Sequence, residues 1–294
     1  MGVRRLIDVQ RTLVTTPSLV DRNCSGKMVM AKLTPDELKL LDPYTLLAVL
    51  GKKVIRPGGR GSSETIFRMA DFQADHNVLD IGCGVGTTAI EITSRFGCHV
   101  TAVDIDNRMI EYARNNIRRA GVADRITLKQ CDIQALPFAH SVFDVVTIEA
   151  VSMFTRDQQA SIQEAVRVCR PGGYVFDHEF VWAKPPPTNL RHVFDAMVCP
   201  GMSFETEREW SELYQSAGQE DIRAVPVPFD LLTPRGMLRD EGLTGTIAFI
   251  GRAMSRWGYI TRMLWLIRVL AKVSPFLSSV VIASTKPSHA SPPC

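Results

Sequence analysis

Short apolar runs alternate with segments of helical periodicity between residues 77 and 180. The apolar runs cover residues 78–81, 99–103, 125–130, 143–148 and 174–180. Helical patterns cover residues 87–96, 107–120 and 155–169, and in the second of these Met109, Ile110, Ala113 and Ile117 share one stripe. Buried strands that alternate with amphipathic helices are typical of βαβ units around a parallel sheet covered on both faces. The pattern therefore predicts an α/β fold with a doubly wound sheet.

The alternation breaks after Trp182. Residues 184–187 read Lys-Pro-Pro-Pro, a stiff connector, and residues 204–216 are helical in pattern. Residues 222–229 contain two prolines and predict an edge strand, while residues 279–283 predict a last strand. We expect a helical N-terminal cap over 1–60 and a core domain over 61–286. Lid insertions are expected at about 184–220 and 230–276, and a disordered tail at 287–294.

Composition and charge exclude several classes of protein. The chain has 294 residues, 45% of them hydrophobic and 22% charged, which is ordinary for a globular protein. A net charge of +3 gives no electrostatic basis for a nucleic-acid partner. The seven cysteines are scattered, without a CxxC pair, which favours neither a zinc site nor a disulfide framework. With no signal peptide or apolar run of membrane-spanning length, we expect a cytoplasmic location.

A glycine-rich segment follows the first of these strands. Residues 78–86 read VLDIGCGVG, so Gly82, Gly84 and Gly86 recur at every second position before a helix. Glycines allow a tight turn and close contact between a ligand and the free N–H groups of a helix N-terminus. Dinucleotide-binding loops have GxGxxG spacing instead. Asp80, just before the loop, would repel a diphosphate but suits a cationic group.

Two further acids follow the next strands. Asp104 ends the second strand, 22 residues after Gly82, close to the separation of about 20 expected for an acid that binds ribose hydroxyls. Asp132 lies just past the third strand, where an adenine amino group could donate to it and Ile133 could flank the ring. The three acids predict a nucleoside site at one edge of the sheet.

At this point the chain resembles class I S-adenosylmethionine-dependent methyltransferases. The matching segments are VLDIGCGVG (78–86), VTAVDID (100–106), KQCDIQALPF (129–138), FDVVTIEA (143–150) and CRPGGYV (169–175). They occur in family order and cover roughly residues 60–185. The resemblance implies a Rossmann-like seven-stranded sheet, S-adenosyl-L-methionine as cofactor and S-adenosyl-L-homocysteine as product.

The resemblance also implies roles for individual residues. Asp80, Gly82, Cys83 and Gly84 would line the methionine end, Asp104 would bind the ribose, and Asp132 and Ile133 the adenine. Ile105 would pack on the other side of the adenine. Arg60 and Ser62 would reach the methionine carboxylate, unless they only cap the helix that follows.

The acceptor site is expected beyond the fourth strand, at residues 148–154. Glu149, in an Ile-Glu-Ala context, resembles the corresponding segment of sterol and isoprenoid C-methyltransferases. There the acid would stabilise a carbocation or accept its proton; otherwise Glu149 is a strand-end residue that hydrogen-bonds the cofactor or a loop. His178 is a candidate base for an O-methyl acceptor, or a structural histidine. No metal site is expected, although Glu149 with Asp177 or Glu179 could supply oxygen ligands.

The C-terminal region 242–274 is apolar and basic, with no acid. It is expected either to close over a hydrophobic acceptor or to form a cover helix, an oligomer contact or a peripheral membrane contact. The residues expected to touch substrate are Tyr44, Met153, Glu179, Trp257 and Trp265.

We therefore predict methyl transfer to a small hydrophobic acceptor, foremost C-methylation of an isoprenoid, sterol-like or quinone-type substrate. O- or N-methylation of an aromatic or alkaloid-like natural product is the alternative. A non-catalytic cofactor-binding partner subunit is the alternative of another class. A homo-oligomer is a further expectation, and the Asn/Asp-Pro-Pro-Tyr/Phe signature of base-modifying enzymes is absent.

Overall fold

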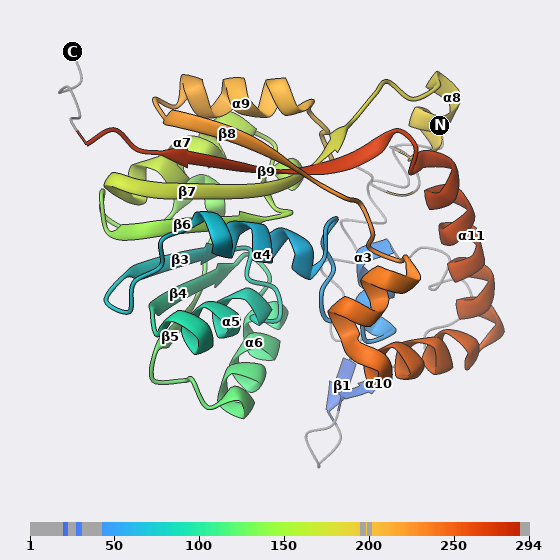
Figure 1. The fold of residues 1–294 in the computed structure, drawn as a ribbon. Coiled ribbons are helices and arrows are strands. Elements are labelled where there is room, and N and C mark those ends of the chain that lie inside the picture. Colours follow the sequence, from blue (N-terminus) through green and yellow to red (C-terminus); the bar gives the residue numbers. More distant parts are fainter. Residues whose placement is uncertain (1–19, 23–27, 31–42, 195–197, 199–201, 289–294) are drawn as a thin grey trace.

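A seven-stranded sheet forms the centre of the molecule. The computed structural model describes residues 20–22, 28–30, 43–194, 198 and 202–288 (Figure 1). The strand order is β5-β4-β3-β6-β7-β9-β8, and β9 runs antiparallel to both of its neighbours. The strands are β3 (Asn77–Ile81), β4 (His99–Asp104), β5 (Ile126–Gln130), β6 (Phe143–Glu149), β7 (Cys169–Trp182), β8 (Glu220–Val227) and β9 (Leu277–Thr285). The predicted α/β fold with a seven-stranded sheet is confirmed.

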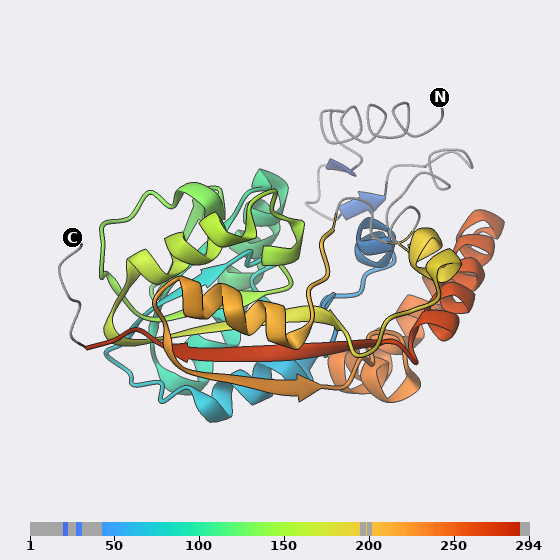
Figure 2. The same cartoon turned by 90° about the horizontal axis from the view of Figure 1, so that it is seen from above.

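Helices cover both faces of this sheet. On one face lie α4 (Arg60–Met69), α5 (Thr87–Phe96) and α6 (Asn107–Ala120), whose buried residues pack with Val78 and Val100. On the other lie α7 (Gln158–Val168) and α9 (Glu207–Ser216), which pack with Leu79 and Ile81. Figure 2 shows α4 and α9 on opposite sides of β8 and β9. Because successive strand residues point to opposite faces, each strand contributes to both layers of the core.

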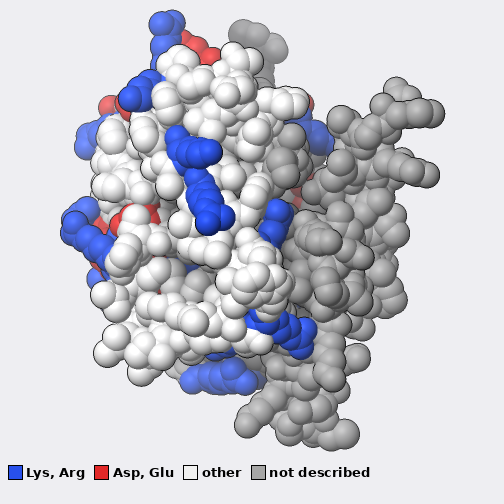
Figure 3. All heavy atoms as spheres, turned by 90° about the vertical axis from the view of Figure 1, so that its right-hand side faces the viewer, with Lys and Arg blue, Asp and Glu red and all other residues white. Residues whose placement is uncertain are grey.

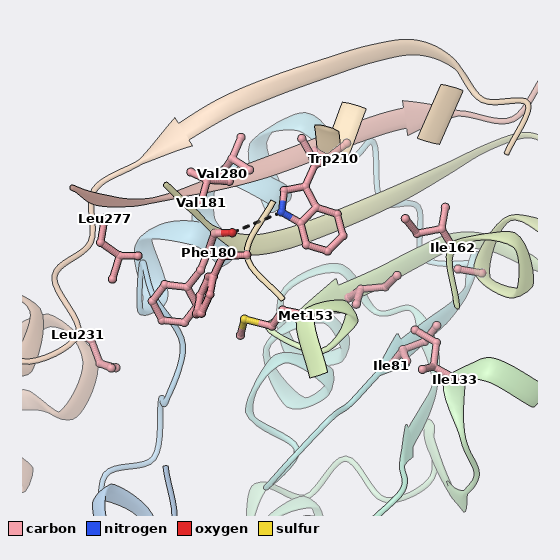
Figure 4. Packing of buried hydrophobic residues seen from close by; sticks show 14 of the residues in the cluster. Ile81, Ile133, Met153, Ile162, Phe180, Val181, Trp210, Leu231, Leu277 and Val280 are labelled. Carbon is pink, nitrogen blue, oxygen red and sulfur yellow. Dashed lines mark hydrogen bonds between the residues drawn. The ribbon is translucent and has the colours of Figure 1, made fainter. Parts of the chain in front are cut away.

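The core on the α9 side extends to the end of β7 (Figure 4). Trp210 of α9 is fully buried, and its indole Nε1 donates a hydrogen bond to the Phe180 carbonyl at 3.3 Å. Residues 204–216, which we expected within a lid insertion, thus supply a helix that packs on the sheet. Trp210 belongs to the same hydrophobic cluster as Met153, in the short 3₁₀ helix η2 (Ser152–Phe154) that follows β6.

Local sequence explains where most elements begin and end. Asp106 caps α6 by accepting a hydrogen bond from the Arg108 amide, and Gly121 ends the helix with φ 73°. Residues 170–173 read Arg-Pro-Gly-Gly, a sequence typical of a turn, and lie inside β7. Gly172 has φ 73° there, and the register with β6 shifts between Phe143 and Val145, which accommodates the extra residues.

Further helices lie beyond the carboxyl ends of the parallel strands, on the right of Figure 1. They are α3 (Pro43–Val49), α8 (Thr188–Val193), α10 (Pro234–Met254) and α11 (Trp257–Val273). The described part of residues 1–60 is not wholly helical, since β1 (Val20–Arg22) and β2 (Met28–Met30) pair antiparallel. Within the described residues, no helix has the length and apolar character needed to cross a bilayer. Most of the expected tail lies outside the described residues.

Candidate active site

The glycine loop between β3 and α5 has a left-handed backbone at all three glycines. Their φ angles are 69° at Gly82, 53° at Gly84 and 83° at Gly86. A Cβ on Gly82 would lie 2.1 Å from Cγ2 of Val151, so a larger residue has no room there. A Cβ on Gly84 would meet nothing within 4 Å. The loop is therefore packed on one side and open at Gly84, as a cradle for a ligand requires.

The two acids after β4 and β5 lie at the same edge. Asp104 accepts hydrogen bonds from the Gly84 and Asp106 amides, both at 2.9 Å, one at each carboxylate oxygen. Asp132 caps the 3₁₀ helix η1 (Ile133–Ala135) by accepting from the Gln134 amide at 2.9 Å. The Cys131 amide donates to the Asp104 carbonyl at 3.1 Å, which joins the two strand ends. A carboxylate has about four acceptor positions, so Asp104 keeps capacity for ribose hydroxyls.

The two isoleucines predicted to pack on the adenine, Ile105 and Ile133, differ in exposure. Ile105 is 65% exposed beside this edge, whereas Ile133 is buried in the hydrophobic core. Cys83 is also buried, and burial raises the pKa of its thiol. All four cysteines in the described part of the chain are free.

Asp80 and Arg56 each have one buried side-chain atom without a hydrogen-bond partner among the described residues. Oδ1 of Asp80 accepts from Thr147 Oγ1 at 3.2 Å, while Oδ2 has no hydrogen-bond partner among the described residues. Burial, with a smaller contribution from the Glu149 carboxylate, raises the pKa of Asp80 to about 7. Nη2 of Arg56 is likewise buried without a partner in the described structure. One unpartnered carboxylate oxygen and one unpartnered guanidinium nitrogen match the ammonium and carboxylate of an amino acid.

Glu149 lies at the centre of a buried polar cluster. Its carboxylate accepts hydrogen bonds from Arg56 Nη1 at 3.0 Å and Thr88 Oγ1 at 2.8 Å. Ser63 Oγ donates to it at 3.0 Å, and Ser62 Oγ is 3.4 Å from it. Glu149 thus joins the end of β6 to the loop before α4 and to the first turn of α5. Of the two roles left open by the sequence, this geometry corresponds to the residue that hydrogen-bonds a neighbouring loop.

Arg60 does not lie free beside the glycine loop. Its guanidinium forms an ion pair with Glu91, and its Nε donates to the Asp240 carbonyl at 3.2 Å. Sequence reasoning, which considered Arg60 for the methionine carboxylate, missed Arg56, whose guanidinium pairs with Glu149. The available signal was the glycine-rich segment 56–60, Arg-Pro-Gly-Gly-Arg, which holds both arginines. Ser62 does not cap α4 either: the helix begins at Arg60, and Ser62 Oγ donates to the Gly59 carbonyl at 2.7 Å.

The loop before α4 is fixed by two acids of α10. Asp240 accepts from the Arg60 amide at 2.9 Å and from Lys52 Nζ at 3.4 Å. Glu241 Oε1 accepts from the Lys53 and Val54 amides at 2.9 and 3.1 Å. Residues 52–60 therefore depend on contacts with a helix about 180 positions later in the chain.

The polar residues of β7 divide between the two faces of the sheet. Asp177 accepts from Tyr214 Oη and Ser152 Oγ, both at 2.9 Å. Glu179 accepts from the Val151 and Ser152 amides at 3.0 and 2.6 Å, and so holds the segment after β6. Burial raises the pKa of Asp177 to about 6 and that of Glu179 further above its usual range.

His178 points to the opposite face, where its Nε2 lies 3.0 Å from Ser279 Oγ. Burial, and then the Arg56 cation, lower the pKa of His178 to about 3, so the imidazole is neutral at physiological pH. In the described part of the chain, no group of three or more His, Cys, Asp or Glu residues is arranged to hold a metal ion.

An apolar cavity of about 20 Å³ lies between the end of β7 and the helices beyond it. Tyr44 lines it and also packs edge-on against Phe154, with ring centroids 5.4 Å apart. Met153 is fully buried in the adjacent core. Trp257 is 77% exposed on the outer surface, and Trp265 is half-buried under the Arg262 guanidinium. The cavity is lined by Pro43, Tyr44, Leu47, Phe180, Phe194, Val198, Phe229, Leu231, Leu266 and Leu270.

Comparisons with known proteins agree with this geometry. Residues 78–173 match the model of a methyltransferase domain family. An uncharacterized methyltransferase, YodH of Bacillus subtilis, is 32% identical over 183 residues, which cover 61% of this chain and 75% of YodH. The ubiquinone/menaquinone biosynthesis C-methyltransferase UbiE of Vibrio parahaemolyticus is 31% identical over 174 residues, 58% of this chain and 64% of that protein.

Among solved structures, phosphoethanolamine N-methyltransferase 2 of Haemonchus contortus, in complex with S-adenosyl-L-methionine, superposes with a TM-score of 0.69. It is 20% identical, and the match covers 89% of this chain and 62% of that one. At this identity the likeness concerns the fold.

The chain belongs to the class I S-adenosylmethionine-dependent methyltransferases, and S-adenosyl-L-methionine is its cofactor. The residues present fit that cofactor, because Asp80 Oδ2 and Arg56 Nη2 are buried without partners among the described residues and the backbone is open at Gly84. When bound, the cofactor supplies a methyl group on a sulfonium. This chain would hold it through Asp80, Arg56, the glycine loop, Asp104 and Asp132.

Proposed function

We propose that the enzyme methylates a carbon atom of a hydrophobic small molecule, such as an isoprenoid-bearing or quinone-type ring. The observation that carries this proposal is the lining of the cavity, which consists of apolar side chains apart from one hydroxyl, that of Tyr44. At about 20 Å³ the cavity holds roughly one water molecule, so the helices around it have to move apart to admit an acceptor of this size. A sugar or an amino acid would leave its polar groups unpaired there, at a cost of roughly 1–3 kcal/mol for each buried group. A hydrophobic acceptor has no such cost.

The aromatic side chains of the cavity favour carbon as the methylated atom. Methylation of an alkene or an electron-rich ring generates positive charge on carbon, and aromatic faces stabilise cations within about 6 Å. Four of the ten lining residues are aromatic: Tyr44, Phe180, Phe194 and Phe229. The name of the UbiE relative, a C-methyltransferase of quinone biosynthesis, supports the same class of reaction.

We assign Glu149 a positioning role in place of the predicted catalytic one. Its carboxylate accepts hydrogen bonds from Arg56, Thr88, Ser63 and Ser62, which fill its acceptor positions. Glu149 is also not among the residues that line the cavity. It holds the Arg56 guanidinium, whose second nitrogen is then directed to the carboxylate of the cofactor's methionine.

The alternative is O- or N-methylation of an aromatic compound, in which a base removes a proton from the acceptor. The observation that favours it is the Tyr44 hydroxyl, the one titratable group of the cavity lining. His178 is not suited to this role, because it lies against Ser279 on the α4 side of the sheet.

The test is a methyl-transfer assay with prenylated quinols, isoprenoids, phenols and aromatic amines, with product structure determined by mass spectrometry and NMR. We expect a new carbon–methyl bond on a prenylated quinol or isoprenoid and turnover retained by Tyr44→Phe. Methylation only at oxygen or nitrogen, abolished by Tyr44→Phe, would establish the alternative. Asp104→Ala is the control for cofactor binding, and calorimetry should show weaker binding of S-adenosyl-L-methionine by this variant.

A further inference from the structure

An exposed apolar stripe runs along α10 and α11. It consists of Leu243, Ile247, Ile250, Met254 and Trp257, each between 49% and 77% exposed. The spacings of four and three residues place the α10 members on one helical face. Eight of the eleven exposed large hydrophobic residues in the described structure lie between residues 238 and 267. Such a concentration of exposed hydrophobic residues on two consecutive helices is typical of an interaction surface rather than of an ordinary solvent-exposed helix.

The kink in α10 separates this stripe from the part of the helix that supports the active site. Gly242 has φ 69° and ψ 177° inside the helix. Asp240, just before it, is buried and anchors the loop before α4, whereas Leu243, just after it, is 66% exposed. In the second half of α10 the side that carries the stripe therefore faces outward, while Phe249, on the same half, is buried in the core.

Every charged residue between the kink and the end of α11 is basic. No Asp or Glu follows Glu241 anywhere in the sequence. Arg252 lies on α10, Arg256 is the N-cap residue of α11, and Arg268 and Lys272 lie on α11. Figure 3 shows this side of the molecule as a mostly uncharged surface with scattered Lys and Arg, and with Asp and Glu confined to its margins. An apolar stripe with an exposed tryptophan and surrounding cations matches the boundary between the headgroups and acyl chains of an anionic bilayer.

We propose that the α10–α11 face docks on the surface of a membrane that contains anionic lipids. A second copy of this chain is a poor occupant, because a two-fold interface would bring the same cations of both copies together without acids to neutralise them. The docking also gives the cavity a source of hydrophobic ligands. Leu266 and Leu270, on the inner side of α11, line the cavity, so the helix that faces the bilayer also bounds the acceptor site.

The test is co-sedimentation of the full-length protein with vesicles of phosphatidylcholine, with and without phosphatidylglycerol. We expect pelleting with the anionic vesicles that weakens as sodium chloride is raised. Met254→Glu, at a position 67% exposed, should weaken binding by about tenfold or more. Val142→Glu is the matched control, because it adds the same charge at an exposed hydrophobic residue outside the stripe and should bind like the unmodified protein.

Tryptophan fluorescence gives an independent measurement. Trp257 is 77% exposed, whereas Trp182 and Trp210 are buried. Anionic vesicles should shift the emission to the blue, and Trp257→Phe should remove most of that shift. The proposal is overturned if the protein does not pellet with anionic vesicles at low salt, or if Met254→Glu and Val142→Glu bind alike. It is also overturned if light scattering without lipid shows a dimer that Met254→Glu converts to monomer. Neither experiment involves methyl transfer, so failure of the proposed acceptor would leave this result intact.

Discussion

Arg56 and Glu149 form a buried ion pair whose two members can be removed separately. The side chains are 10% and 5% exposed, and Nη1 and Oε1 lie 3.0 Å apart. Arg56→Met leaves the Glu149 carboxylate with hydroxyl donors but no cation. Loss of one partner from a buried pair lowers the free energy of unfolding by about 3–5 kcal/mol. For a chain of this size we expect the melting temperature to fall by on the order of 10 °C.

The same variants separate the structural role of the pair from cofactor binding. If Arg56 Nη2 holds the methionine carboxylate, Arg56→Met also loses a charge-assisted hydrogen bond, worth about 1.5–3 kcal/mol. Its affinity for S-adenosyl-L-methionine should then fall by roughly tenfold to a hundredfold. Glu149→Gln should destabilise the fold to a similar degree but retain the Arg56 cation, so its affinity should change little. Calorimetry well below the melting temperature of each variant measures the affinity for S-adenosyl-L-methionine on folded protein. The melting temperature itself measures the loss of stability.

An exposed pair provides the control. Arg95 and Glu64 are 45% and 47% exposed, and Arg95→Met should change the melting temperature only slightly, since exposed pairs contribute little. The reasoning is refuted if Arg56→Met melts like Arg95→Met. If Arg56→Met is destabilised yet binds the cofactor as tightly as the unmodified protein, Arg56 has no contact with the carboxylate.

Two further predictions concern the glycine loop and the acid before it. Gly84→Ala and Gly121→Ala should both cost about 1–2 kcal/mol, because each glycine has positive φ and open space around it, but only Gly84→Ala should weaken cofactor binding in calorimetry. The pKa of Asp80 is raised to about 7, above its unfolded value near 4, so stability falls as the pH rises from about 4 to about 7 and changes little beyond. Asp80→Asn should therefore stabilise the cofactor-free protein by about 2–3 kcal/mol more at pH 8 than at pH 5 in denaturant titrations. Cofactor affinity of the unmodified protein should rise between pH 6 and 8, and a flat profile would contradict the role of Asp80.

The sequence predicted the strands and helices of the central sheet because their signals are local. Asp106 and Gly121 bound α6 at the predicted residues, 107–120, since a cap and a left-handed glycine act within one turn. The acids at the ends of β3, β4 and β5 were also identifiable, because parallel strands end at a common edge. The family resemblance then supplied the cofactor.

The cluster around Glu149 could not be read in the same way. Which arginine of residues 56–60 reaches Glu149 depends on the path of a loop that Asp240 and Glu241 fix from a distant helix. The exposure of Trp257 depends on how α10 and α11 pack against the rest of the molecule, whereas the sequence shows only an apolar region in which every tryptophan is a candidate for the cavity. Contacts between distant segments decide both cases, and a single sequence does not encode them in a local pattern.

The hydrogen bonds of Asp240 and Glu241 with residues 52–60 have a consequence for how acceptor choice can evolve in this chain. Residues 230–276, which supply Leu231, Leu266 and Leu270 to the cavity lining, and the segment that holds Arg56 are joined by these contacts. A change of substrate by exchange of residues 230–276 with another methyltransferase would therefore remove the support of Arg56 at the same time. The two segments have to be inherited as one unit, and grafts that exchange them together should yield functional chimaeras more often than grafts of the cover alone.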